Sequence, residues 1–186
     1  MKETESKKHK TLSKINIQWN EYKYDYQKEL TSNLDKLSGD FNQSIINEII
    51  LWKLNRYAKI DDETLSYLNK INETDKEINL SLTRKVLEKL LLTKGIRLPI
   101  ASSILRFKNP SLYQIIDQRA YRLINDDELK LPSSIENQID LYLVYLSKLR
   151  DVCKNKNIPF KDADRILYEI DKKVNKKIKL KNYGKS

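Results

Sequence analysis

Residues that interrupt helices are scarce in this chain, and their scarcity restricts the fold more than any other feature. Only 3 glycines and 4 prolines occur among 186 residues. These two residue types disfavour helix interiors most strongly. The sequence also has no long run in which β-branched side chains alternate with polar ones, as strands prefer. It therefore predicts an all-α fold, a compact single-domain bundle of about eight helices.

Apolar residues recur every three or four positions, the spacing of one helix face. This spacing predicts helices over 15–37, 42–57, 81–93, 99–107, 135–154 and 162–178, a short helix beginning near Asp61 or Asp62, and another after Asp117. The helix over 42–57 is so rich in isoleucine that we expect it at the centre of the core. We expect a disordered basic arm over 1–14, one helical domain over 15–178 and a basic tail over 179–186.

The net charge of +10 is unevenly distributed along the chain. Residues 1–14 carry +3, residues 94–122 carry +5 and residues 171–186 carry +6, whereas the rest sums to −4. Such basic segments attract phosphate chains by releasing counterions. Acidic lipids and acidic proteins would be attracted as well, so charge alone does not choose among these partners.

Two absences in the sequence narrow the class of protein further. Cys153 is the single cysteine, so we expect no disulfide framework and no cysteine-ligated metal or iron–sulfur cluster. We also expect no other metal site and no cofactor. No apolar run approaches the ~18–20 residues that span a bilayer, and the charged N-terminus does not resemble a secretory signal. The sequence therefore predicts a cytoplasmic protein without a membrane partner.

The most informative stretch is Lys94-Gly95-Ile96-Arg97-Leu98-Pro99-Ile100-Ala101, followed by Ile115-Ile116-Asp117 and, five residues later, Arg122. A glycine turn between two short helices presents backbone N–H groups and a helix N-terminus to solvent. That arrangement binds a phosphate without reading base sequence.

This pattern resembles the helix-hairpin-helix superfamily of DNA glycosylases. The hairpin of that superfamily is typically Leu-Pro-Gly-Val-Gly-x-x-x-Ala, and a hydrophobic pair, the catalytic Asp and an Arg follow it. Gly95 corresponds to the first hairpin glycine, Ala101 to the small residue of the second helix, and Arg97 replaces the second glycine. The 22 residues from Gly95 to Asp117 fit the family. The resemblance covers residues 83–124 and is topological elsewhere.

The resemblance implies a monofunctional DNA glycosylase that acts on double-stranded DNA. Pro99 stands where bifunctional members keep a lysine, so a Schiff base is not expected there. A modified or mismatched base would be flipped out of the helix, and Asp117 would stabilise the oxocarbenium-like transition state as the N-glycosidic bond breaks. The implied setting is DNA repair or defence against modified phage DNA, by a nucleoid-associated monomer. The implied DNA contacts are Lys94, Gly95, Ile96, Arg97, Arg119 and Arg122.

A second segment, Trp52-Lys53-Leu54-Asn55-Arg56, is similar to a Trp-Lys-x-x-Arg element of small bacterial proteins that also carry the hairpin and the Asp. Those proteins end in an Asp-Arg-Ala-Leu-Trp-like helix, whose counterpart is the segment 164–168. This similarity implies that Trp52 stacks on the flipped base and that Lys53 lines the substrate pocket.

Other interpretations of the same residues remain open. Asp117 precedes a helix, where Asp commonly caps the N-terminus without any catalysis. Trp52 suits a core position, and Asp164 with Arg165 suits a buried structural pair. At the level of function, the alternatives are a non-catalytic helix-hairpin-helix DNA-binding module and a basic protein-interaction domain.

Overall fold

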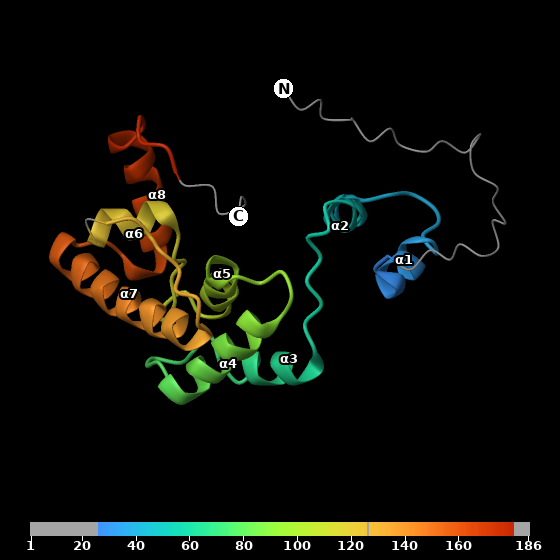
Figure 1. The fold of residues 1–186 in the computed structure, drawn as a ribbon, viewed down its shortest axis with the longest axis horizontal. Helices are drawn as coiled ribbons and strands as arrows, with labels where there is room; N and C mark the ends of the chain where they lie inside the picture. Colours follow the sequence, from blue (N-terminus) through green and yellow to red (C-terminus); the bar gives the residue numbers. More distant parts are fainter. Residues whose placement is uncertain (1–25, 126, 181–186) are drawn as a thin grey trace, which may run out of the picture. The chain divides into compact units, whose positions relative to one another are not determined.

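The computed structural model describes residues 26–125 and 127–180, and all regular secondary structure in these ranges is helical (Figure 1). Eight α-helices and one short 3-10 helix lie within the described residues. The predicted all-α class is therefore confirmed. The arm predicted over 1–14, the part 15–25 of the helix predicted over 15–37 and residues 181–186 of the tail lie outside the described residues. In the described part of that predicted helix, the structure has a shorter one over Lys28–Leu34.

The chain divides into two compact units, residues 1–57 and residues 58–186. The first unit contains α1 (Lys28–Leu34) and α2 (Gln43–Lys53). The second contains α3 (Asp62–Leu68), α4 (Leu80–Leu92), α5 (Leu98–Lys108), α6 (Gln118–Asn125), α7 (Ile135–Lys156), a 3-10 helix (Phe160–Asp162) and α8 (Ala163–Val174). The single domain expected over 15–178 extends across this division, so its unity stays a prediction.

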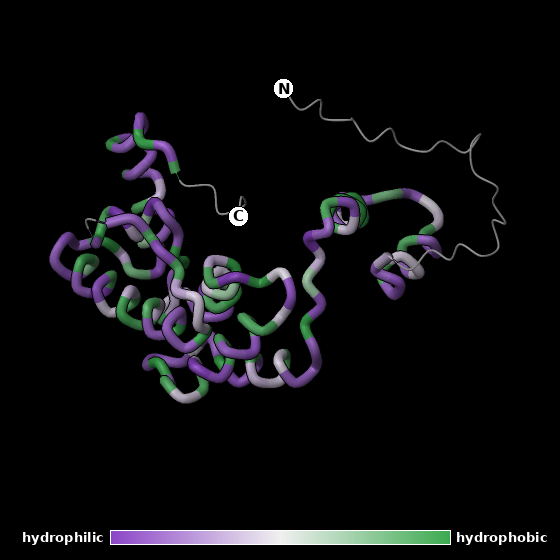
Figure 2. The backbone as a smooth tube through the Cα atoms, viewed as in Figure 1, coloured by the Kyte–Doolittle hydropathy of each residue, from purple (hydrophilic) through white to green (hydrophobic). Residues whose placement is uncertain are grey.

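Helix α2 does not lie at the centre of a core, contrary to the expectation from its isoleucines. None of its residues is buried, and Ile46, Ile50 and Leu51 are 39–48% exposed. Figure 2 shows how hydrophobic this helix is. Within its unit, α2 packs against α1 alone among the described helices, and α1 buries no residue either. The many apolar residues of this segment correctly indicated a helix, but they did not indicate which other elements pack against its faces.

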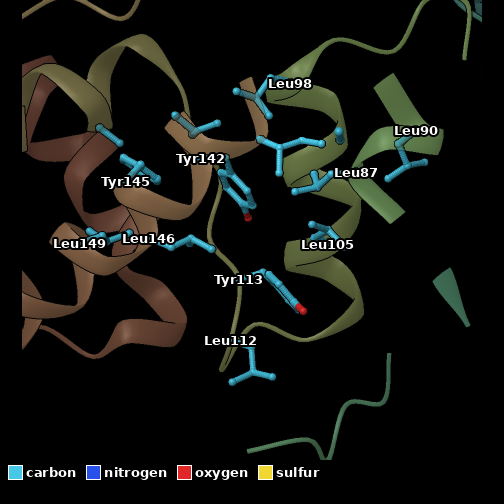
Figure 3. Close-up of a cluster of buried hydrophobic side chains, with 14 of the residues drawn as sticks. Leu87, Leu90, Leu98, Leu105, Leu112, Tyr113, Tyr142, Tyr145, Leu146 and Leu149 are labelled. Carbon is cyan, nitrogen blue, oxygen red and sulfur yellow. The ribbon is translucent and has the colours of Figure 1, made fainter. Parts of the chain in front are cut away.

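The hydrophobic core lies within the second unit. Every buried apolar residue in the described chain falls between Ile71 and Leu167. It contains leucines of α4, α5 and α7 together with Tyr113, Tyr142 and Tyr145 (Figure 3). Burying a leucine side chain stabilises a fold by ~2 kcal/mol. Around this core, α4 packs against α3, α5 and α7, whereas α6 packs against α7 and α8.

Short polar side chains set the helix boundaries. Asp61, Asn79 and Ser134 each accept a hydrogen bond from the backbone N–H three residues later, at 2.7, 3.0 and 3.2 Å, which satisfies an N–H that has no partner inside the helix. Asn157 ends α7 in the left-handed conformation (φ 55°). The helix predicted over 162–178 is shorter, because a 3-10 turn precedes it and α8 ends at Val174.

Candidate functional site

Residues 93–97 connect α4 to α5 and contain the predicted hairpin glycine. Gly95 adopts φ +89°, a conformation that strains residues with a Cβ. Ile96 is only 5% exposed and anchors the connection in the core, while Lys94 and Arg97 on either side are exposed. The structure thus has two helices joined by a glycine turn. Their assignment as a hairpin of the glycosylase type stays a prediction.

The N-terminus of α5 follows directly from this connection. Arg97 immediately precedes α5 with an extended backbone (φ −110°, ψ 167°), so arginine at this position, in place of the family's second glycine, needs no left-handed conformation. No side chain caps the helix, and proline occupies its first turn. The helix dipole therefore presents its positive end beside two exposed cations, Lys94 and Arg97.

Residues 109–117, which link α5 to α6, pass along the core without forming a helix. Buried backbone polar groups without partners are costly, and side chains from other elements supply the partners here. Tyr142 donates to the Gln114 carbonyl at 3.0 Å and Tyr145 to the Ile115 carbonyl at 2.9 Å. The Ile116 N–H donates to Ser102 Oγ at 3.2 Å. These bonds position the chain immediately before Asp117.

The buried side chain of Gln114 ties the same linker to α8. Its Nε2 donates to the Pro110 carbonyl at 2.8 Å, and its Oε1 accepts from the Asp164 N–H at 3.2 Å. Both ends of the amide are therefore satisfied. Sequence reasoning missed Gln114, because the partner that gives it this role lies 50 residues away.

Asp117 is half-buried at the N-terminus of α6. Its Oδ1 accepts a 2.7 Å hydrogen bond from the Ala120 N–H, so the predicted role as N-cap is confirmed. Burial raises the pKa of Asp117, while the backbone N–H groups of Ala120 and Arg119 and the charge of Arg119 act in the opposite direction. The nearby carboxylate of Asp164 adds a smaller upward contribution to that pKa. Asp117 is thus a carboxylate partly removed from water, beside another acid.

Two arginines predicted to contact DNA surround the buried carboxylate of Asp171. Arg122 Nε and Nη2 donate to the two carboxylate oxygens at 2.6 and 2.7 Å, and Arg119 Nη1 donates at 2.8 Å. Hydrogen bonding to Arg122, followed by that to Asn175 and Arg119, lowers the pKa of Asp171 to about 2. The cluster joins α6 to α8 and carries a net positive charge. Arg119, whose side chain is 24% exposed, reaches the surface more than Arg122 at 12%.

Asp164 pairs with Arg106 of α5 and not with its neighbour in sequence. Arg106 Nε and Asp164 Oδ2 lie 3.5 Å apart, and both side chains are at least 92% buried. Arg165 is exposed, and its backbone N–H donates to Asp164 Oδ1 at 2.7 Å. The interpretation of Asp164 and Arg165 as a buried pair is therefore wrong: on a helix, consecutive side chains point in different directions.

Trp52 and Lys53, the predicted pocket residues, belong to the first unit. The Trp52 indole donates to Thr31 Oγ1 at 3.0 Å and contacts the Tyr26 ring edge-to-face, with centroids 5.7 Å apart. Lys53 is exposed at the end of α2. Asp117 lies in the second unit, so the role of Trp52 and Lys53 toward a flipped base stays a prediction.

The hollows lined by described residues include two of substantial size. The larger, of about 750 Å³, runs between α3, α4 and the start of α7 and includes Tyr67, Leu82, Lys85 and Ile139. The smaller, of about 490 Å³, lies at the end of α7 beside Arg150 and Phe160. Asp117 lines neither of them.

Within residues 26–125 and 127–180, no helix combines the length and apolar character required to cross a membrane. The same residues contain no group of three or more His, Cys, Asp or Glu side chains that could hold a metal ion.

Comparisons of the chain with protein-family models, with curated proteins and with solved structures found no match.

Proposed function

We propose that this protein is a monofunctional DNA glycosylase in which Asp117 assists hydrolysis of the N-glycosidic bond of a flipped base. The observation that carries the proposal is the position of Asp117: a partly desolvated carboxylate, fixed at the start of α6 by the linker that follows α5. Carboxylates in such surroundings stabilise developing positive charge more strongly than carboxylates in water.

In the proposed reaction, the bond between the base nitrogen and C1′ of the deoxyribose breaks, and the leaving base takes a proton at that nitrogen. Positive charge develops on the sugar, and ionised Asp117 stabilises it. A water molecule adds to C1′ and gives up a proton, so the products are the free base and an abasic site. The exposed cations Lys94 and Arg97 would contact phosphates, together with backbone N–H groups of Gly95 and Ile96. Arg119 and Arg122 would add positive charge from their cluster with Asp171.

One observation favours the second candidate, a DNA-binding module without catalysis. Asp117 already has a structural function as the cap of α6, and Asp171 engages Arg122 with both of its oxygens. A protein that used the α4–α5 connection only to bind phosphates would also keep an aspartate at this position, because the aspartate caps α6.

The decisive experiment compares the wild type with Asp117→Asn on duplexes carrying modified or mismatched bases and on modified phage DNA. Released base and alkali-sensitive abasic sites are measured. Asparagine caps helices about as well as aspartate but carries no charge, so the variant should fold and bind DNA yet release no base. Asp61→Asn is the matched control, because Asp61 caps α3 through an identical 2.7 Å bond.

The outcomes separate the candidates. Base release by the wild type and by Asp61→Asn, but not by Asp117→Asn, supports the glycosylase. DNA retention without abasic product on any substrate supports the module. A wild-type protein that fails to retain DNA at low salt, where phosphate contacts are strongest, contradicts both and leaves the protein-interaction domain.

A further inference from the structure

Helix α8 carries an exposed basic face beside α6, defined here as Arg165, Tyr168, Lys172 and Lys176. Spacings of three and four residues place these positions along one side of the helix and of the turn that follows it. All four residues are exposed. Residues 172–180 contain five lysines and no acidic residue, and Figure 2 shows this end of the chain with hydrophilic positions among hydrophobic ones.

The ring of Tyr168 contacts two cations, one from α6 and one from α8. Its ring centroid lies 5.3 Å from the guanidinium carbon of Arg119 and 5.2 Å from Lys172 Nζ, both within the range of cation–π attraction. Two cations from different helices are thereby held around one half-exposed ring. Glu169 pairs with Lys172 at 3.0 Å, and Asp171 is buried between Arg119 and Arg122, so the cations remain in excess.

The basic face adjoins the proposed catalytic carboxylate. Arg119 lies two residues after Asp117, and α6 packs against α8 (Figure 1). A nucleic-acid strand at Asp117 would therefore have positive charge available along α8.

From these observations we propose that the basic face of α8 is a second DNA-contact surface, which binds the phosphate backbone next to the site at Asp117. This proposal rests on the proposed DNA-binding function. Tyr168 acts as a positioning residue that holds Arg119 and Lys172 together. The exposed apolar residues Ile170, Val174 and Ile178 follow a different side of the helix, at four-residue spacing. Interfacial membrane helices also carry their apolar residues on a face separate from their cations, so binding to acidic vesicles is measured as a separate outcome of the test.

The first test uses the full chain with the three cations of the basic face, Arg165, Lys172 and Lys176, replaced by Gln. The matched control replaces Lys130, Lys154 and Lys156, which are exposed lysines outside α8, and removes the same charge. Binding to a 20-base-pair duplex is measured between about 50 and 300 mM salt. Each phosphate contact contributes ~0.9 to the slope of log affinity against log salt. We expect the slope to fall by about 2 and the affinity at low salt to fall at least ~10-fold in the α8 variant only.

The second test separates positioning from a general structural effect. Tyr168→Phe keeps the ring and should bind DNA as the wild type does, whereas Tyr168→Leu should weaken binding ~3-fold or more. Both variants should unfold at the wild-type temperature, because Tyr168 is half-exposed.

The proposal is overturned if the α8 variant and the lysine control bind duplex DNA with the same salt slope. If both variants still bind DNA, the proposed glycosylase function is unaffected. If the wild type does not bind DNA, the proposed function is itself contradicted. A third test measures binding of the same variants to vesicles of phosphatidylcholine with ~30% phosphatidylserine. Loss of vesicle binding with unchanged DNA binding in the α8 variant would assign this face to acidic lipid and reject the proposal.

Discussion

Two features of Asp117, its role as a helix cap and its burial, affect its pKa in opposite directions. As the cap of α6 it accepts a backbone N–H, which favours the ionised carboxylate, whereas its burial favours the protonated one. Burial is the larger effect, and the pKa of Asp117 is raised. A carboxylate used as an electrostatic catalyst is expected in such partly desolvated surroundings.

The raised pKa of Asp117 predicts two pH profiles. Base release requires the ionised form, so activity should decline on the acid side at a higher pH than an ordinary aspartate would cause. A carboxyl whose pKa is raised by folding stabilises the fold most below its unfolded pKa, and this contribution is lost as the pH rises through the folded pKa. Asp117→Asn should therefore gain stability relative to the wild type as the pH increases above about 4. Urea unfolding from pH 3 to 7 measures the difference, and a difference that shrinks with pH would contradict the assigned burial.

Asp171 should show the opposite pH dependence. Folding lowers its pKa from 3.8 to about 2, so its stabilisation is present above 3.8 and is lost as the pH falls toward 2. We expect the loss to be about 1–2 kcal/mol, since solvent around Arg119 screens part of the interaction. Asp171→Asn should lack this acid transition and should cost about 2–4 kcal/mol at pH 7, because two arginines lose their shared partner. Glu169→Gln, which removes an exposed pair, should change stability by less than about 0.5 kcal/mol.

At the scale of elements, the sequence predicted those features that depend on neighbouring residues. The caps at Asp61 and Asp117 and the turn at Gly95 follow from residues within three positions, and the structure contains them. The support of the linker 109–117 does not follow from local sequence, because Tyr142 and Tyr145 reach it from 28 and 30 residues away. Amphipathic spacing could assign these tyrosines to an inward face of α7, but it could not specify which carbonyls their hydroxyls would meet.

Removing those hydroxyls tests the support of the linker. Tyr142→Phe and Tyr145→Phe each leave one carbonyl of the linker without its donor, and each should lower the free energy of unfolding by about 1–2 kcal/mol. Tyr121 stacks on Tyr145 with centroids 6.2 Å apart and is half-buried, so Tyr121→Phe provides a control expected to change stability by less than about 0.5 kcal/mol. Chemical denaturation measures all three variants. Equal losses in all three would contradict the assigned support, because phenylalanine keeps each ring and the bonds to the linker come from the hydroxyls of Tyr142 and Tyr145.

At the scale of the whole molecule, the apolar content of the sequence did not reveal how burial is shared between the two units. The buried apolar residues of the described chain lie in the second unit, and the described helices of the first unit bury none. The isoleucines of α2 and the leucines of α4 follow the same periodicity. Helix α4 packs against three other helices, whereas α2 packs within its unit against α1, and no pattern within either segment encodes that difference.

This unequal burial predicts that the two units unfold at different denaturant concentrations. Both tryptophans precede residue 58 in the sequence, and Trp52 packs against Tyr26 within the first unit. Tryptophan fluorescence therefore follows that unit, while circular dichroism at 222 nm follows helices throughout the chain. We expect the fluorescence transition at lower urea, because burial of apolar surface is the main stabilising contribution. As a control, Leu105→Ala removes a fully buried side chain of the second unit and should cost about 2–5 kcal/mol. It should shift the circular dichroism transition and leave the fluorescence transition in place. Coincident transitions that shift together would instead establish one cooperative domain over 15–178.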